Sequence, residues 1–321
     1  MSIVKGLQQI PTPLAGLALG LASLGLNLDQ RLALSGAMQW ALGLVAAMLL
    51  LPVLLKYLSC PRQLPADLGH AVVGSVAPTF SMALMVISLS LGALSELAAQ
   101  ILWGAAVLLH LLLLAGFVRH QWPSLGWQRI APSWFVPPVG IIVAAVTCPN
   151  DAMVPVASLL LYAGMAAYGV MLPLMLYRLM FHGPLPSAAA PTLAILAAPA
   201  SLSLTGYLSL IEPVQPLVIA LLLGIALLMT ALVYLALIQL LRQPFTPGFA
   251  AFTFPLVIGA SALYQCAGFF AQRQLDYAEL LWTLADLELA IATLVIGYVC
   301  VCYARAYGGA RLFRRLSRHV A

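Results

Sequence analysis

The chain has 321 residues, of which 63% are hydrophobic and only 7% are charged, and its mean hydropathy is +1.04. Because a soluble domain carries about 25% charged residues, this composition excludes a soluble domain of useful size. It predicts an all-α integral membrane protein with one transmembrane domain over 1–321. The net charge of +5 is assigned to loops and the tail, so it bears on orientation and lipid and predicts no nucleic-acid partner.

Ten apolar windows separated by short polar loops predict ten transmembrane helices, since each crossing takes about 20 residues. In chain order they are 10–27, 34–57, 70–92, 95–118, 133–149, 153–180, 191–211, 214–241, 248–270 and 278–304. The even-numbered windows are Leu-rich and mostly unbroken. Each odd-numbered window has a proline a turn or two from its start: Pro13, Pro78, Pro137 with Pro138, Pro199, and Pro255. This recurrence predicts five similar helical hairpins.

A proline inside a membrane helix removes one backbone donor and clashes with the preceding turn, so these helices are expected to kink. Freed backbone groups are tolerated where they are buried in protein or line a wet cavity. Small or polar residues follow the prolines and are predicted to line the pore: Gly16, Gly20, Thr79, Ser81, Gly140, Ser201, Ser203, Gly259 and Ser261. The predicted architecture is pseudo-fivefold, with five kinked helices around a central pore and five straight helices outside. The competing explanation is that Pro and Gly are simply common in membrane helices.

The distribution of Lys and Arg predicts the orientation of the chain. Twelve lie at the termini or after even-numbered windows, and only Arg31 and Arg273 lie on the other side. Positive residues accumulate in cytoplasmic loops, so both termini are predicted to be cytoplasmic. The basic tail, 305–321, is expected to lie against the anionic inner leaflet.

The interiors of the odd-numbered windows contain no Lys, Arg, Asp or Glu. A path without ionisable groups binds ions weakly, as conduction requires, and backbone N–H groups at helix breaks favour anions. Asp286 and Glu288 on the last window lie about 200° apart on a helix, and a structural, hydrogen-bonded role is expected for them. His110 is interpreted as a packed histidine.

Two other patterns bear on chemistry. Residues 259–262, Gly-Ala-Ser-Ala, match the short G-x-S-x pattern of intramembrane serine proteases, but that chemistry needs a histidine within the membrane, and only His110 is available. The five cysteines show neither CxxC nor a histidine at metal spacing. The sequence therefore predicts neither an enzyme nor a metal or cofactor site.

The stretch 247–270 carries Phe254 immediately before Pro255, where the helix is expected to bend. A bulky ring set against the break would fill a pore whose other walls are small or aliphatic. Phe254 is therefore the predicted pore gate, and Phe252 is the second choice if the register is misjudged. The competing interpretation is that Phe254 is core packing between helices.

Three stretches carry a family resemblance: Phe252-Thr253-Phe254-Pro255, the run GSVAPTFSMALM at 74–85, and the run PSWFVPPVGIIVA at 132–144. They resemble the tellurite-resistance/dicarboxylate transporter family, whose members include bacterial TehA, fungal malate permeases and the slow-type anion channels of plant guard cells. The resemblance implies a bacterial inner-membrane protein and a homotrimer with one pore in each protomer. It also implies a phenylalanine on the ninth helix that closes the pore, and Phe254 matches that position. The long cytoplasmic domains of the plant channels have no counterpart here.

The leading functional hypothesis is a gated, passive channel for small anions. The alternative is a secondary transporter of C4-dicarboxylates or related organic acids and oxyanions, such as malate or tellurite, driven by a proton gradient or the membrane potential. A third hypothesis is a membrane scaffold with a vestigial pore. A cation or a coupled acid inside the pore would favour the transporter, and the sequence shows none.

Overall fold

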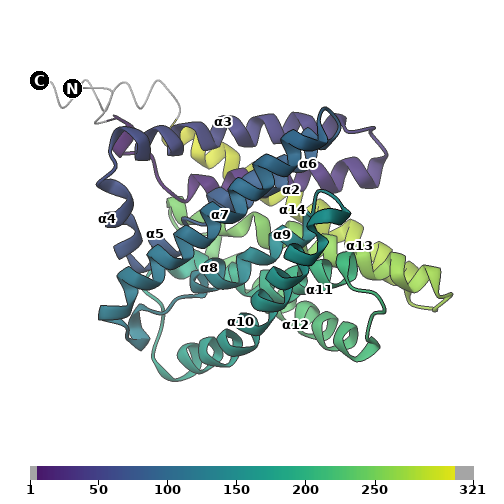
Figure 1. Cartoon of the computed structure of the whole chain (residues 1–321). Helices are drawn as coiled ribbons and strands as arrows, with labels where there is room; N and C mark the ends of the chain where they lie inside the picture. The colour runs from purple at the N-terminus through teal and green to yellow at the C-terminus, as the bar shows by residue number, and fades with distance from the viewer. Residues whose placement is uncertain (1–5, 308–321) are drawn as a thin grey trace, which may run out of the picture.

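The computed structural model describes residues 6–307, and every regular element in that range is helical (Figure 1). Eight helices are long and apolar enough to cross a membrane. Five of them are continuous and coincide with the even-numbered windows to within a few residues: α3 (Ala37–Ser59), α7 (Glu96–Gln121), α10 (Val154–Phe181), α12 (Pro216–Leu240) and α14 (Ala278–Tyr307). Lys5 and the tail cations Arg311, Arg314, Arg315 and Arg318 lie outside the described residues.

The other three long helices are composite. Residues 71–92 form α5 (Ala71–Val76) and α6 (Thr79–Gly92), 190–210 form a 3₁₀ helix (Ala190–Ala197) and α11 (Ala198–Leu210), and 247–272 form a 3₁₀ helix (Pro247–Phe252) and α13 (Phe254–Gln272). Two further apolar segments stay below the criteria for a crossing helix. One is α2 (Leu14–Leu32), whose last turns hold Asn27, Asp29, Gln30 and Arg31, and the other is the short run Pro132–Val146.

The prolines mark junctions between helical pieces rather than bends within one helix. Pro13 and Pro78 directly precede α2 and α6, and Pro199 and Pro255 occupy the first turns of α11 and α13. In a first turn the missing N–H is one that a helix leaves unpaired anyway, so proline costs little there. Pro137 and Pro138 lie in α8 (Val136–Val139), which a 3₁₀ turn separates from α9 (Val143–Val146). We call 13–32, 71–92, 132–146, 190–210 and 247–272 the proline-marked segments.

Burial separates the two kinds of element. In the three composite crossing helices, 61–72% of the most apolar window is buried, against 22–39% in the five continuous helices. Leu108, Leu112, Leu228 and Leu235 on the continuous helices are among the strongly exposed apolar side chains. Apolar side chains that face outward suit contact with lipid. The proline-marked segments therefore form the interior, and the continuous helices surround them.

Side chains of the continuous helices satisfy carbonyl groups of the broken segments. The His110 ring Nε2, on α7, donates to the Pro137 carbonyl at 2.9 Å, and Trp103 Nε1 donates to the Ala144 carbonyl at 3.2 Å. On α14, the Tyr303 hydroxyl donates to the Pro247 carbonyl at 2.6 Å. An unpaired buried carbonyl is costly. His110, which is completely buried, therefore has a structural task here.

Two cations that were counted as loop residues are buried in the protein. Lys56 donates to Asp67 at 2.7 Å and to Thr12 at 3.0 Å, in a network that Tyr57 and Gln63 complete. This network ties α3 to α4 (Gln63–Gly69) and to the start of α2. Arg178, 1% exposed, donates to the Gly183 carbonyl at the end of α10. These cations stabilise helix ends in addition to any role in orientation.

Candidate permeation pathway

Two cavities lie along the proline-marked segments. The narrow cavity, of about 70 Å³, is bounded by the first halves of all five segments. Its lining is almost entirely apolar and includes no charged side chain. From the successive segments it takes Pro13, Gly16 and Leu19; Val72, Val76, Thr79 and Met82; Phe135, Val136, Val139 and Gly140; Thr192, Ile195, Ala198, Pro199 and Leu202; and Gly248, Ala250, Ala251, Phe254 and Pro255.

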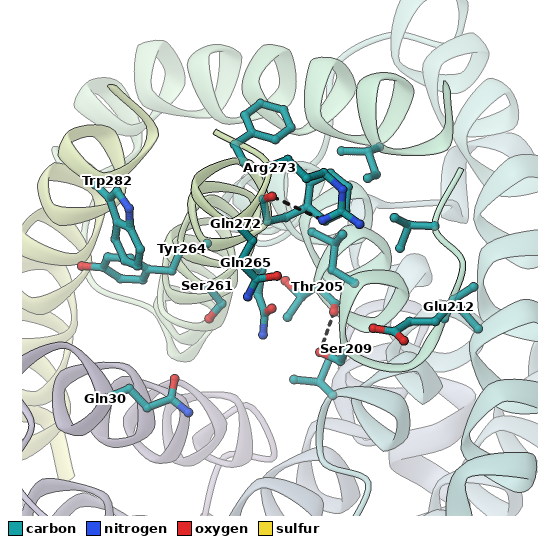
Figure 2. A pocket seen from close by; sticks show the side chains of 18 of the residues that line it. Gln30, Thr205, Ser209, Glu212, Ser261, Tyr264, Gln265, Gln272, Arg273 and Trp282 are labelled. Carbon is teal, nitrogen blue, oxygen red and sulfur yellow. Dashed lines mark hydrogen bonds between the residues drawn. The ribbon is translucent and has the colours of Figure 1, made fainter. Parts of the chain in front are cut away.

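The wide cavity, of about 1560 Å³, lies at the opposite ends of the same segments. Figure 2 shows its labelled side chains around an open centre, with Ser261, Gln265, Gln272 and Arg273 along α13. Tyr264 of α13 also lines it, and the other elements supply the polar residues Asn27, Gln30, Arg31, Gln39, Thr205, Ser209 and Glu212. The wide cavity is thus a polar space, unlike the narrow one.

A common spacing connects the two cavities. Each proline-marked segment supplies one residue to the narrow cavity and the residue seven positions later to the wide cavity. The pairs are Leu19 and Leu26, Met82 and Leu89, Val139 and Val146, Leu202 and Ser209, and Phe254 and Ser261. In the four segments that are α-helical between the two members, seven residues are close to two turns, so both members lie on one helix face. In 132–146 a 3₁₀ turn lies between Val139 and Val146, and this segment too contributes to both cavities, so all five segments border one axis along which both cavities lie.

The two cavities are separated by a closed region about 10 Å long, the rise of seven helical residues. On the narrow side it begins with five tightly buried apolar side chains, namely Leu19, Met82, Val139, Leu202 and Phe254, which are 1–8% exposed. The residues four positions further along are Ser23, Val86, Val143, Gly206 and Ile258. Ser23 is the only polar side chain of this second layer, and its buried hydroxyl has no hydrogen-bond partner.

The two candidate gate residues differ sharply in environment. Phe254 lines the narrow cavity, whereas Phe252 lines neither cavity and is completely buried. Phe252 packs against Phe249, with 5.0 Å between ring centroids, and Phe249 packs in turn against Phe245. Phe252 is thus a core residue, and Phe254 faces the axis.

The other residues predicted for the pore fall into two groups. Pro13, Gly16, Thr79, Gly140, Pro199, Phe254 and Pro255 line the narrow cavity, and Ser261 lines the wide one. Pro78, Pro137, Pro138, Gly20, Ser81, Ser201, Ser203 and Gly259 line neither. Gly20 instead allows close packing, because a Cβ there would lie 2.5 Å from the Thr253 side chain.

Most hydroxyl groups expected in the pore give their hydrogen to their own helix. Ser201 and Ser203 donate to the carbonyl groups four residues earlier, as do Thr205 and Ser209 in the wide cavity. A hydroxyl has one hydrogen to give. The side-chain donors that remain for an anion in the wide cavity are therefore amide and guanidinium groups and the indole N–H of Trp282.

Sequence reasoning missed the charged side chains of the wide cavity. Arg31 forms a bidentate ion pair with Asp286, at 2.5 and 2.7 Å, and the Tyr264 hydroxyl donates to the same carboxylate at 2.7 Å. Arg273 forms no ion pair among the described residues. Its guanidinium carbon lies 3.7 Å from the centre of the Phe269 ring, and one of its N–H groups donates weakly to the Phe269 carbonyl. Glu212 adds one carboxylate.

Asp29, two residues before Arg31 on α2, ties the end of this helix to the start of α3. Asp29 accepts from the backbone N–H groups of Gly36, Met38 and Gln39 at 2.8–3.0 Å, and so caps the start of α3. A carboxylate is favoured at a helix N-terminus. The sequence held a signal for the Asp29 cap, because this carboxylate comes shortly before an apolar helix. It held none for the Arg31–Asp286 pair, because the two residues are 255 positions apart. In 6–307, no group of three or more His, Cys, Asp or Glu side chains is placed to hold a metal ion.

The geometry is that of a helical membrane protein with two cavities along one axis and a closed region between them, an arrangement that suits a transporter or a channel. Residues 10–304 match the family described as voltage-dependent anion channel, and the chain belongs to that family. This match bears out the resemblance to the tellurite-resistance/dicarboxylate transporters. The chain is also 25% identical to the uncharacterized transporter MJ0762 of Methanocaldococcus jannaschii, over 70% of this chain and 73% of the relative. Its identity to MJ0576 of the same organism is 25%, over 51% of each chain.

Proposed function

We propose that the protein is a gated, passive channel for small anions whose pore runs through the wide cavity, past Phe254, and through the narrow cavity. In this proposal all ten predicted helices cross the membrane, and the five proline-marked segments form a pseudo-fivefold ring. The observation that carries it is the common seven-residue spacing, because five unrelated packing arrangements would not all turn one face to the same axis. Family membership supports anions as the permeating ions.

The closed layer explains how such a pore would be held shut. Five apolar side chains meet between the cavities, and a hydrophobic constriction blocks ions by dewetting as well as by bulk. Phe254 has the largest side chain of the five. The wide cavity would gather anions before this barrier, since Arg273 has no ion-pair partner among the described residues and the amides of Gln265 and Gln272 belong to the same lining.

Truncation of the gate tests this proposal. Phe254→Ala should raise the anion conductance of the purified protein in planar bilayers at least about tenfold, which requires about 1.4 kcal/mol off the barrier. Phe252→Ala is the matched control, with the same truncation two residues away in the core. It should leave conductance low and chiefly lower stability. Unchanged conductance in folded Phe254→Ala protein would remove the gate assignment.

The charged side chains of the wide cavity, Arg31, Arg273 and Glu212, are a feature expected of the transporter alternative, and that alternative makes a different electrical prediction. A passive pore lets anions reach a reversal potential set by their own gradient, whatever the pH difference across the bilayer. Coupling to protons would shift that potential with the pH difference. We therefore expect the reversal potential of Phe254→Ala channels to follow the anion gradient alone, and a shift with pH would favour the transporter.

The same proposal places the protein in a bacterial inner membrane as a homotrimer with both termini cytoplasmic. The orientation is supported by the twelve-to-two distribution of Lys and Arg, and the trimer by the family resemblance. A reporter fused to the C-terminus that is active only on the periplasmic side would overturn the orientation.

A further inference from the structure

Glu288 is a buried carboxyl group that the proposed pathway does not use. The residue is 6% exposed. The Oε1 atom is buried away from solvent and has no hydrogen-bond partner among the described residues. Asp286, two residues earlier on α14, is fully occupied by Arg31 and Tyr264. The two acids therefore differ in their partners: Asp286 is paired with a cation, and in the part of the chain that the structure describes Glu288 has no cation or donor.

The Glu288 carboxyl lies against the back of the helix that carries the gate. Its Oε1 is so close to Gly259 of α13 that a side chain at that position would collide with it. At 100° per residue, Gly259 lies about 140° from Phe254 and 160° from Ser261, which face the axis. Gly259 is also next to Ile258, in the second layer of the closed region. The carboxyl is thus directly behind the constriction.

Within residues 6–307, no cation faces this carboxyl. The elements that pack against α14 are α13, α2 and the 3₁₀ helix Pro247–Phe252, and this last element has no titratable side chain. On α2, Asp29 caps α3 and Arg31 is paired with Asp286. Cys266 is two turns further along the same face of α13. From α12, the Tyr234 hydroxyl interacts electrostatically with Glu288 and is itself buried without a hydrogen-bond partner.

Protonation decides whether this arrangement is tolerable. A carboxylate without a cation or donors is expensive in apolar surroundings, whereas the neutral acid costs far less. Loss of the proton would create a charge that needs water or a donor. Because Gly259 leaves no space beside Oε1, water or a donor reaches that atom only if α13 and α14 separate or the Tyr234 hydroxyl turns toward it. Separation would move Phe254 and Ile258 on the opposite face of α13.

We propose that Glu288 is a proton-binding site that couples pH to the gate: the protonated form holds α13 in the closed position, and loss of the proton favours a conducting one. This inference rests on the proposed pore function. Allosteric couplings of ordinary size correspond to about 5- to 150-fold changes. We therefore expect the conductance of the unmodified protein to rise at least about fivefold when pH increases through the titration of Glu288.

The test compares three proteins in planar bilayers with the same pH on both sides. Glu288→Gln keeps the size of the neutral acid and cannot ionise, so its conductance should stay low across the pH range. Asp286→Asn, the matched change two residues away, should keep the pH response of the unmodified protein. A Glu288→Gln protein with the unmodified pH profile would overturn the proposal.

Infrared spectroscopy provides a readout that does not depend on conduction. At neutral pH the folded protein should show the carbonyl band of a protonated carboxylic acid that Glu288→Gln lacks, and Tyr234→Phe should retain it. Absence of that band would refute the proton site even if Phe254→Ala opens the pore. If the band is present but Phe254→Ala does not conduct, the proton site stands and the channel proposal fails.

Gly259→Ala checks the contact itself. The added methyl group must displace the carboxyl, so the variant should conduct at a pH where the unmodified protein is closed. Combining it with Glu288→Ala makes room for the methyl group and should restore the closed state. If Gly259→Ala leaves the low-pH conductance unchanged, the mechanical coupling between the two helices is wrong.

Discussion

The narrow and wide cavities are built from the same five segments and differ in nearly every other respect. One is about 70 Å³ and almost entirely apolar, and the other is about 1560 Å³ and is lined by two arginines, one carboxylate and several amides. The ion pairs near the two cavities differ in exposure. The Lys56–Asp67 pair, which contacts Thr12 next to Pro13 of the narrow cavity, is buried. Both side chains of the Arg31–Asp286 pair are more than 40% exposed. In the proposed function the barrier to ions thus lies at the narrow cavity, and the wide cavity concentrates anions at the other end of the path.

The largest expected effect is on thermal stability, and it should distinguish the two ion pairs. Removing one partner of a buried pair leaves the other charge uncompensated and costs about 3–5 kcal/mol, so Asp67→Ala should lower the Tm in detergent on the order of 10 °C. Asp286→Ala breaks an exposed pair, which contributes little in solvent, and should leave the Tm nearly unchanged. Equal losses of Tm in the two variants would show that the two ion pairs contribute equally to stability.

The pH dependence of the buried pair follows from its surroundings. Burial alone would raise the pKa of Asp67, but hydrogen bonds from Lys56, Gln63 and Thr12 outweigh it and hold the pKa below its ordinary 3.8. A carboxyl whose pKa is lower in the folded state contributes stability above the unfolded pKa and loses it as pH falls through the folded value. The unmodified protein should therefore lose Tm below about pH 3.8, and Asp67→Asn should lose less over that interval.

The sequence allowed the continuous apolar helices and the broken, proline-marked segments to be predicted, because each rests on local features. It identified only part of the residues that line the two cavities. The prolines stand at different distances from the closed layer: Pro13 comes six residues before Leu19, whereas Pro255 comes one residue after Phe254. A junction can fall at several heights along an axis, so proline position alone does not fix which small residues line it, and Gly20 and Ser201 pack elsewhere.

The charges of the wide cavity were unpredictable for another reason. Arg31 looked like a loop cation and Asp286 like an intramembrane acid, because their pairing joins residues 255 positions apart. Lys56 and Arg178 were likewise counted as surface cations. A count of charges in loops assigns a side of the membrane but carries no information on which side chains turn inward.

A smaller effect should come from the unpaired cation of the wide cavity. Arg273→Gln, introduced together with Phe254→Ala, should lower anion conductance about threefold at about 0.01 M salt, where the Debye length is about 30 Å, and hardly at all near 1 M. The matched control is Arg242→Gln on the same background, since Arg242 is exposed at the other end of the molecule and lines neither cavity. Equal effects of the two changes would indicate a general surface charge rather than a role for this cavity.

The smallest effect, and the one that locates the boundary between the cavities, concerns Ser23. Its hydroxyl is the one polar group in the second layer of the closed region and has no partner, so it is free to donate to an ion that passes. Removing it should cost a conducting protein one modest hydrogen bond, about 0.5–1 kcal/mol. On the Phe254→Ala background, Ser23→Ala should therefore reduce conductance about two- to fivefold. Stability should not fall, because an unpaired buried hydroxyl contributes nothing to it.

Ser88→Ala is the matched control, since that hydroxyl is also buried but donates to the Met85 carbonyl at 2.6 Å. If Ser23→Ala and Ser88→Ala conduct equally, ions do not pass between Leu19 and Leu26, and the axis drawn through the two cavities is wrong.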